Sequence, residues 1–435
     1  MKKLILFFIF ISLSSFLFSQ SMNLNSAVSY LKDYTDYNEG ITSLQKAKDN
    51  IEIAAKGDGT KDKAKTWYYR GLIFQTFFEL GIKNDISKSQ EKDMTKKYSS
   101  AYQTVSVADL DEAVISFKKS IELDSKKDYE KECKTRISNI SNNYYNKADA
   151  FYSAKNYSDA GVYYEKAYEL KNSLNISDTS SIYNVAISSI KSQNYKKAEQ
   201  FFTKLIELKY KADKPEKFYV AIIHMYKDAK DTSATRIAIQ TARKALPENA
   251  EIMALEIDLY SIAMDNTEDP IKRKELAQKA INALNSGIAT NPKNHEFYLV
   301  LGNTYNKMAF PKSKTESASK PSNYDELVKK AEENYLKSIE LKPDYFLGHY
   351  LLGVCYYNQA MNIQKEADTI KDKKKLDEAD KKTDVLLQKG ILCLEKANQI
   401  DPTDKDAMKS LMILYARTGQ GDSDKYKKIN ELYKK

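Results

Sequence analysis

The chain has 435 residues, with 69 Lys and Arg against 60 Asp and Glu, which gives a formal charge of +9. Hydrophobic residues make up 42% and charged residues 30%, whereas Gly (13) and Pro (8) are scarce. This composition excludes collagen-like, disordered and turn-rich all-β chains. Three Cys and three His exclude a disulfide scaffold and leave little material for a zinc or haem site.

The N-terminus has the pattern of a secretory signal peptide. Lys2 and Lys3 precede an apolar stretch, residues 4–18, that is too short to span a bilayer. We expect residues 1–20 to be a signal peptide cleaved near Ser19 to Ser21, with an uncleaved anchor as the alternative. No Cys follows the stretch, so the lipoprotein signal is missing, and the sequence predicts no membrane span in the mature chain. Localisation in the periplasm or at the outer envelope follows, and export argues against a nucleic-acid partner.

A repeat dominates the remaining chain, and the prolines reveal it. Four prolines are each followed thirteen residues later by a tyrosine; the pairs are Pro247 and Tyr260, Pro292 and Tyr305, Pro343 and Tyr356, and Pro402 and Tyr415. Helical patterns with small residues seven positions apart precede three of these prolines. The spacing is explained by a 34-residue unit of two helices that carries insertions between its first and second helix. The insertions fall at about 81–108, 262–272, 308–326 and 359–385.

This pattern resembles the tetratricopeptide repeat family, in which small residues at repeat positions 8, 20 and 27 let two helices approach and large residues at 4, 11 and 24 fill the space beside them. The residues that carry the resemblance are Trp67, Gly71, Ala113, Ala148, Ala160, Ala167, Gly302, Tyr305, Ala331, Pro343, Gly353, Tyr356, Ala397 and Pro402. Some copies depart from the pattern, since Ser189 replaces an aromatic residue and Thr235 a small one. Position 32 of the first three copies is Ser125, Asn172 or Tyr210 instead of proline.

The resemblance implies an all-α, right-handed solenoid of antiparallel helix pairs, with helical or loop insertions on one edge. We expect residues 21–61 to form an N-terminal helical hairpin that caps a solenoid over 62–435. The expected helix pairs are approximately 64–124, 141–172, 180–210, 216–247, 250–292, 295–343, 346–402 and 405–435.

No motif for catalysis, nucleotide binding or metal binding occurs, so we expect no enzyme activity, no cofactor and no metal. The three histidines are far apart in the repeat. Cys133, Cys355 and Cys393 lie in helical patterns that favour buried thiols, with a bridge between Cys355 and Cys393 as the alternative.

Tyrosine is abundant, with 32 copies, and some tyrosines fall outside the packing positions. In the family that the sequence resembles, positions 2, 5, 9, 12 and 13 of the first helix line a concave surface that holds peptides. The resemblance therefore implies a candidate peptide groove formed by Tyr68, Tyr145, Asp149, Tyr152, Tyr183, Asn184, His224, Asn303, Tyr350 and Tyr357. The alternative is that these tyrosines pack between adjacent helices. A clamp for a C-terminal carboxylate is not supported, because Tyr145, Asp149 and Ala221 stand where it needs Lys, Asn and Arg.

These observations predict an exported, non-enzymatic scaffold that binds a protein or peptide in its groove and along its inserted edge, assembling an envelope or periplasmic complex. The principal alternative is a homo-oligomeric structural envelope protein that stacks through its terminal repeats. An enzyme whose catalytic residues lie in the insertions is the third class.

Overall fold

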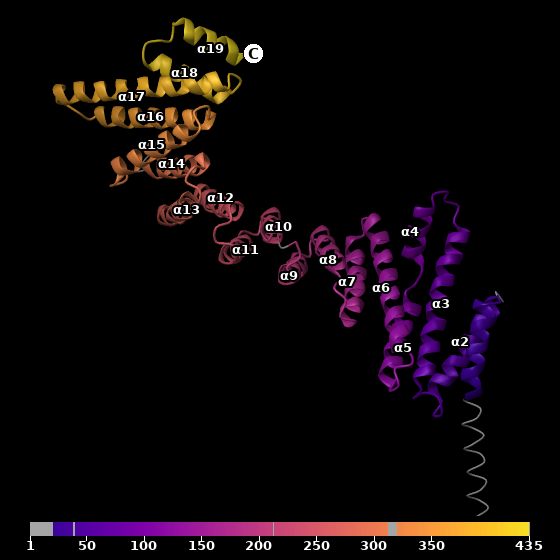
Figure 1. Ribbon diagram of the computed structural model, residues 1–435. Coiled ribbons are helices and arrows are strands. Elements are labelled where there is room, and N and C mark those ends of the chain that lie inside the picture. Colours follow the sequence, from indigo (N-terminus) through magenta and orange to yellow (C-terminus); the bar gives the residue numbers. More distant parts are fainter. Residues whose placement is uncertain (1–20, 38–39, 212, 312–319, 435) are drawn as a thin grey trace, which may run out of the picture. The chain divides into compact units, whose positions relative to one another are not determined.

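The computed structural model describes residues 21–37, 40–211, 213–311 and 320–434, and within them every regular element is an α-helix (Figure 1). The chain divides into two compact units, Met1–Ala229 and Lys230–Lys435. The all-helical prediction is confirmed. The expected signal peptide lies outside the described residues. No helix in the described ranges is both long and apolar enough to cross a membrane.

The first unit is a succession of packed helices. It contains a helix over residues 21–35, followed by α2 (Ile41–Lys56), α3 (Ala64–Lys88), α4 (Met94–Thr104), α5 (Ala108–Leu123), α6 (Glu130–Ser153), α7 (Tyr157–Ser173), α8 (Thr179–Lys191), α9 (Tyr195–Glu207) and α10 (Glu216–Asp228). The first two helices share an apolar cluster with Ile73 of α3, so the N-terminal hairpin is part of the packed array. The core of the first unit is therefore a series of local clusters, as in other stacked repeats.

The second unit continues the same scheme. It contains α11 (Thr232–Ala245), α12 (Ala250–Asn266), α13 (Pro270–Thr290), α14 (His295–Ala309), α15 (Tyr324–Leu341), α16 (Phe346–Ala367), α17 (Lys373–Ile400), α18 (Lys405–Arg417) and α19 (Asp424–Lys434). Consecutive helices pack on each other, and α16 also contacts α14 and α18. The boundary between the units separates α10 from α11, which the sequence analysis placed together in the pair 216–247.

Helix ends follow from local sequence. Asn or Asp precedes many helices and its side chain accepts a hydrogen bond from a backbone N–H of the first turn, as Asn156 does from Asp159 and Asp231 does from Ala234. At α11, α13, α14, α15 and α17 of the second unit, the residue after the helix precedes a proline and lies outside the helical region, for example Lys342 with φ −143° and ψ 86°. Proline excludes the helical conformation at the residue before it, so it ends these helices.

The small residues of the repeat lie where two helices cross. The alanines predicted at these positions, Ala113, Ala148, Ala160, Ala167, Ala331 and Ala397, are fully buried. A Cβ atom added to Gly302 would lie 2.9 Å from Tyr335 Cδ1 and 3.1 Å from the backbone oxygen of Ala331. Gly353 is equally confined, by the Leu394 side chain at 2.8 Å. These positions have no room for a larger side chain.

The insertion at 81–108 is a folded helical return. It extends α3 to Lys88 and adds α4, which packs on both α3 and α6. The ammonium group of the buried Lys147, on α6, donates hydrogen bonds to the carbonyl oxygens of Tyr102 (2.6 Å), Gln103 (3.2 Å) and Val105 (2.9 Å) at the end of α4. These carbonyls have no partner within their own helix end, so Lys147 holds the insertion against the next repeat.

In the second unit, two insertions elongate helices. The sequence around 262–272 lengthens α12 and α13, and that around 359–385 lengthens α16 and α17. Ion pairs join neighbouring insertions, since Lys307 contacts Asp265 at 2.7 Å and Lys320 contacts Glu366 at 2.9 Å. The described ends of the 308–326 insertion therefore lie beside the two neighbouring insertions. Residues 312–319, most of the predicted Ser/Lys-rich loop, lie outside the described residues.

A buried arginine links the N-terminal hairpin to the first repeat. Arg70 Nε donates to Glu52 of α2 at 2.7 Å, while its terminal nitrogens donate to Glu112 and Ser116 of α5, each at 2.7 Å. Its guanidinium lies 4.5 Å from the centre of the Phe74 ring. One cation thus joins three helices, and its hydrogen bonds go to two carboxylates and one hydroxyl.

Candidate functional site

The candidate surface of the first unit is formed by one residue position on three consecutive first helices. Tyr68 of α3, Tyr145 of α6 and Tyr183 of α8 all occupy repeat position 5 and are all half-buried. One part of each ring packs on the protein and the rest reaches solvent. His224, on α10 of the same unit, is exposed.

Tyr145 and its neighbours form a polar network between consecutive repeats. Asn184 Nδ2 donates to the Tyr145 hydroxyl at 2.8 Å, and the Tyr164 hydroxyl donates to Asp149. The rings of Tyr145 and Tyr164 meet edge-on, with centroids 5.2 Å apart. Burial raises the pKa of Tyr145, and the nearby Asp149 carboxylate adds to this rise. Tyr145 therefore remains a neutral phenol, and the Asn184 amide is engaged inside the protein.

The other tyrosines of this surface make aromatic contacts on one side. Tyr68 stacks obliquely on Tyr129 at 4.9 Å and joins the apolar cluster of the first repeat. Tyr152 meets Tyr157 edge-on at 5.1 Å. Tyr183 lies 6.5 Å from the centre of the Phe202 ring. Both interpretations of these residues, packing and partner contact, are compatible with half-buried rings, because one edge can pack while the other binds.

The remaining three candidates belong to the second unit. Asn303 is half-buried on α14. Tyr350 stacks on Phe346 at 5.8 Å, and Tyr357 lies 5.8 Å from the Arg417 guanidinium. Both tyrosines border the apolar cluster formed by α16, α17 and α18. This unit therefore presents its own smaller set of aromatic side chains.

The side chains of the repeat-packing residues are buried to different extents. Tyr356 is buried, and its hydroxyl donates to Glu332 of the preceding repeat at 2.7 Å. Tyr305 and Trp67 are half-buried, and the Trp67 indole donates to the carbonyl oxygen of Lys61 at 2.6 Å. Pro343 and Pro402 are exposed at the turns that follow α15 and α17.

The thiols have little nucleophilic character. Cys133, Cys355 and Cys393 are free, and Cys133 and Cys355 are buried. Burial raises the pKa of Cys355 and of Cys393 to about 11 in each case. Because the thiolate is the reactive form, these side chains are inert near neutral pH. In the described part of the chain, no three His, Cys, Asp or Glu side chains gather in the manner of a metal site.

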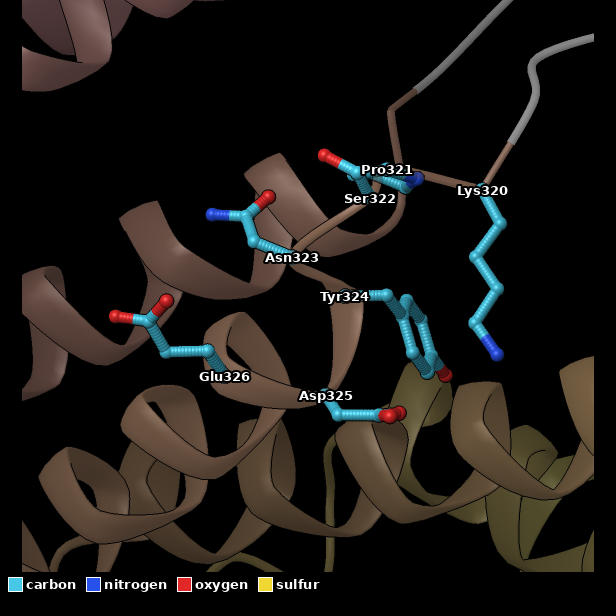
Figure 2. A pocket seen from close by; sticks show the side chains of 7 residues that line it. All are labelled: Lys320, Pro321, Ser322, Asn323, Tyr324, Asp325 and Glu326. Atoms are coloured by element: carbon cyan, nitrogen blue, oxygen red, sulfur yellow. The ribbon is translucent and has the colours of Figure 1, made fainter.

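A cavity of about 500 Å³ lies at the start of α15, lined by Lys320 to Glu326 (Figure 2). All its lining residues come from one short segment. Tyr324 is buried there and its hydroxyl has no hydrogen-bond partner among the residues that the structure describes, while the Lys320 ammonium lies 4.4 Å from the centre of the Tyr324 ring. The hollow brings together no groups from separate elements, so it has none of the convergence expected of a catalytic site.

Sequence reasoning missed the two buried cations and a second cavity. Lys147 follows the core residue Tyr144 by three positions, so a charge on the buried face of α6 was the available signal. Arg70 had a similar signal, since it precedes the crossing residue Gly71. The cavity lies where α7, α8 and α9 meet, and its residues come from three segments whose approach no local pattern predicts.

Comparison with known proteins identifies one repeat directly. A family model described as Tetratricopeptide repeat matches residues 141–174, which include the end of α6 and all of α7. No curated protein matches the chain significantly.

Several solved structures are similar to the chain. A TPR repeats protein from Bacteroides fragilis is 20% identical, with a TM-score of 0.32 over 64% of this chain and 98% of that one. The C-terminal part of a TPR repeat-containing protein from Cytophaga hutchinsonii is 14% identical, with a TM-score of 0.37 over 78% and 99%. YrrB, described as a TPR protein with an unusual peptide-binding site, is 18% identical, with a TM-score of 0.28 over 53% and 95%.

Proposed function

We propose that the chain, one segment of which matches the tetratricopeptide repeat model, is a non-enzymatic scaffold that binds a protein or peptide partner. The observation that carries the proposal is the row of half-buried tyrosines, Tyr68, Tyr145 and Tyr183, at one position of three consecutive repeats. Tyrosine offers a large contact area, few rotatable bonds and one polar group, which suits recognition of a polypeptide.

The internal contacts of these tyrosines favour binding further. Tyr145 is held by Asn184 at 2.8 Å, and the Asp149 carboxylate is held by Tyr164. A surface whose side chains are already ordered loses less conformational entropy when a partner docks. The same contacts leave Asp149 exposed, so one acceptor remains at the edge of the aromatic row.

Export is the second part of the proposal. The basic N-terminus and the short apolar stretch of residues 4–18 support a cleaved signal peptide, and the mature chain would then act in the periplasm or at the outer envelope. A helical repeat array with a partner-binding row suits the assembly of an envelope complex.

Affinity capture tests the binding proposal. Residues 21–435 are immobilised and exposed to envelope extract of the source cells, and retained proteins are identified by mass spectrometry. Tyr183→Ser removes one aromatic surface, whereas Val162→Ser, on the exposed side of α7, is the matched control. We expect a retained protein whose capture weakens only with Tyr183→Ser. Equal capture by both variants, or no protein above the background of bare resin, contradicts the proposal.

One observation favours homo-oligomerisation as a second candidate. The N-terminal hairpin exposes Met22, Ile41 and Ile53, each with more than half of its surface accessible. Exposed aliphatic residues at the end of a repeat array are suited to stacking against another copy. Light scattering after size exclusion decides the matter, since Ile53→Lys should return an oligomer to the monomer. A wild-type monomer at high concentration excludes this candidate.

A further inference from the structure

The boundary between the two units falls inside the fourth repeat, residues 216–247, which we call repeat four. Its first helix, α10, belongs to the first unit, and its second helix, α11, belongs to the second unit. In the other complete repeats, both helices of a pair lie in the same unit and pack on each other. Repeat four therefore differs from the rest, and its crossing residues give the reason.

In several repeats, the close crossing of two helices depends on a glycine. A Cβ atom added to Gly71 would lie 2.5 Å from Phe117 Cε1, and one added to Gly302 would lie 2.9 Å from Tyr335 Cδ1. Ordinary carbon contacts are about 3.5–4.0 Å, so even one further carbon atom is too close. The helices approach only because one of them carries no side-chain atoms at that point.

Repeat four has no small residue at either crossing position. Counted from Pro247 at repeat position 32, position 8 is Ile223 and position 20 is Thr235. Both side chains are buried, and both are β-branched and therefore wide close to the backbone. An isoleucine adds several carbon atoms beyond the Cβ that Gly302 already excludes. A crossing with the geometry of α14 and α15 therefore cannot form in repeat four.

The fifth repeat shows that one large residue alone is tolerated. Its position 8 is also an isoleucine, Ile257, but its position 20 is Ala280, which is fully buried. The helices α12 and α13 pack on each other, and Ile257 shares an apolar cluster with Ile281 and Leu284 of α13. An isoleucine is thus accommodated where the opposite helix has an alanine. The combination of Ile223 with Thr235 is what distinguishes repeat four.

The connection between α10 and α11 is ordinary for this protein. It consists of residues 229–231, and Lys230 is left-handed with φ 58°. Lys155 and Gln193 have φ 62° and 61° in the equivalent turns of the second and third repeats. Those repeats have alanine at both crossing positions, and their helices pack on each other. The same turn thus accompanies a packed pair when the crossing residues are small.

We propose that residues 229–231 are a hinge about which the two units move as separate bodies, because Ile223 and Thr235 keep the helices of repeat four from packing. Contacts in a repeat array join only neighbouring elements, so the loss of one crossing uncouples the repeats before it from those after it. Each unit keeps its own apolar clusters and stays ordered. A few residues at the ends of helices are sufficient to absorb the change in φ and ψ.

The hinge does not depend on the proposed function, since it concerns the packing of repeat four alone. It has a consequence for recognition where that function holds. The first unit carries Tyr68, Tyr145 and Tyr183, and the second unit carries its own pair, Tyr350 and Tyr357. A hinge between them lets the two aromatic sets adjust to the spacing of the sites on a partner.

Double electron–electron resonance on the full chain tests the proposal. Spin labels are attached through bioorthogonal side chains, which leaves the native thiols unchanged. One pair of labels, at Val162 on α7 and Ile237 on α11, lies across repeat four, and a reference pair, at Ile115 on α5 and Val162, lies within the first unit. In the wild type, the distance distribution across repeat four should be at least about twice as wide as that of the reference pair.

Two substitutions at one position separate side-chain size from hydrogen bonding. Thr235→Ala gives repeat four the combination found in the fifth repeat and should narrow the distribution roughly to the reference width. Thr235→Val keeps the size and branching but removes the hydrogen bond that Thr235 Oγ1 donates to the Asp231 carbonyl at 2.7 Å. The distribution of this control should stay broad. Circular dichroism establishes that each variant keeps its helicity.

The converse substitution transfers the combination to the fifth repeat. Ala280→Thr places a threonine opposite Ile257, as Thr235 stands opposite Ile223 in repeat four. Labels at Ile237 on α11 and Leu336 on α15 lie on either side of the fifth repeat's crossing, within the second unit. Their distance distribution should widen about twofold in this variant, because overpacking forces the two helices apart.

Three results overturn the inference. The first is a wild-type distribution across repeat four that is as narrow as that of the reference pair. The second is equal widths for Thr235→Ala and Thr235→Val, which would remove side-chain size as the cause. The third is an Ala280→Thr variant that keeps its helicity and its narrow distribution across the fifth repeat.

Discussion

The crossing of α14 and α15 offers a sharp test of how the repeat packs. A Cβ atom at position 302 would lie 2.9 Å from Tyr335 Cδ1 and 3.1 Å from the backbone oxygen of Ala331. Ordinary carbon contacts are about 3.5–4.0 Å. The ring of Tyr335 is itself fully buried and has nowhere to rotate. Gly302→Ala must therefore push the two helices apart by a few tenths of an ångström.

Two opposing effects set the change in the free energy of unfolding that Gly302→Ala should cause. Overpacking of a tight core costs about 1–3 kcal/mol. Alanine in a helix interior gains about 1 kcal/mol over glycine. We expect Gly302→Ala to lose about 1 kcal/mol of unfolding free energy. Gly302→Leu should lose several times as much, because its longer side chain has no space at all.

Gly161 is the matched control, since it is also a buried helical glycine. A Cβ atom there would meet only Ser188 Cβ, at 3.6 Å, which is an ordinary contact. Only the gain in helix propensity remains, so Gly161→Ala should stabilise the protein by about 0.5–1 kcal/mol. The two substitutions are chemically identical and should have opposite signs.

Urea unfolding measures both free energies, and hydrogen exchange shows where protection is lost. In the Gly302→Ala variant the loss should begin in α14 and α15, because contacts in a repeat array are local. Stabilisation of both variants would show that the crossing adapts freely, which would refute the reasoning. So would a loss of protection confined to helices other than α14, α15 and α16.

Four further predictions follow from single groups. Lys147→Met should lower the free energy of unfolding by about 2–4 kcal/mol, since it leaves three half-buried carbonyls without this donor, and should speed hydrogen exchange selectively in α4; unchanged exchange there would contradict its role. Arg70→Met should lower the free energy of unfolding by about 2 kcal/mol and loosen the N-terminal hairpin. Limited proteolysis should then cleave the loop before α3 faster in the variant, and equal cleavage rates in the variant and the wild type would contradict the prediction. Although burial acts to raise the pKa of Asp124, hydrogen bonds from the backbone N–H groups of Tyr129 and its two neighbours lower this pKa on balance. The stability that Asp124 contributes is therefore present above about pH 4 and is lost as the pH falls below that value. Asp124→Asn should reduce this acid sensitivity in thermal melts at about pH 3 to 6, and parallel curves for the variant and the wild type would contradict the prediction. N-terminal sequencing of the exported protein should begin near Gln20 or Ser21, whereas an intact Met1 in the membrane fraction would favour the anchor.

The helical pairing could be predicted from the sequence because its determinants are local. Pro343 keeps Lys342 out of the helical conformation and so ends α15, whatever the rest of the chain does. Gly302 and Ala331 mark a helix crossing because only small residues permit such an approach. Periodicity and chain stiffness act within a few residues, which is why the 34-residue register could be read from proline and tyrosine spacing.

The candidate site was only partly accessible to sequence reasoning. Repeat register places Tyr68, Tyr145 and Tyr183 at equivalent positions, and the structure has all three half-buried. Their partners depend on contacts between repeats, so the hydrogen bond from Asn184 to Tyr145 could not be inferred from either residue's own helix. The depth of a side chain is decided by its neighbours in space.

Tertiary structure alone decided how the insertions fold and where the recesses lie. The segment 81–108 could have been a loop, but packing on α3 and α6 gives it a helix, α4, whose end needs the distant ammonium of Lys147. The cavity between α7, α8 and α9 likewise requires these three helices to converge. Local sequence determines where a helix begins and ends. Which surfaces those helices bring together is determined by side chains distant in the sequence, which must be buried against one another and must satisfy one another's polar groups.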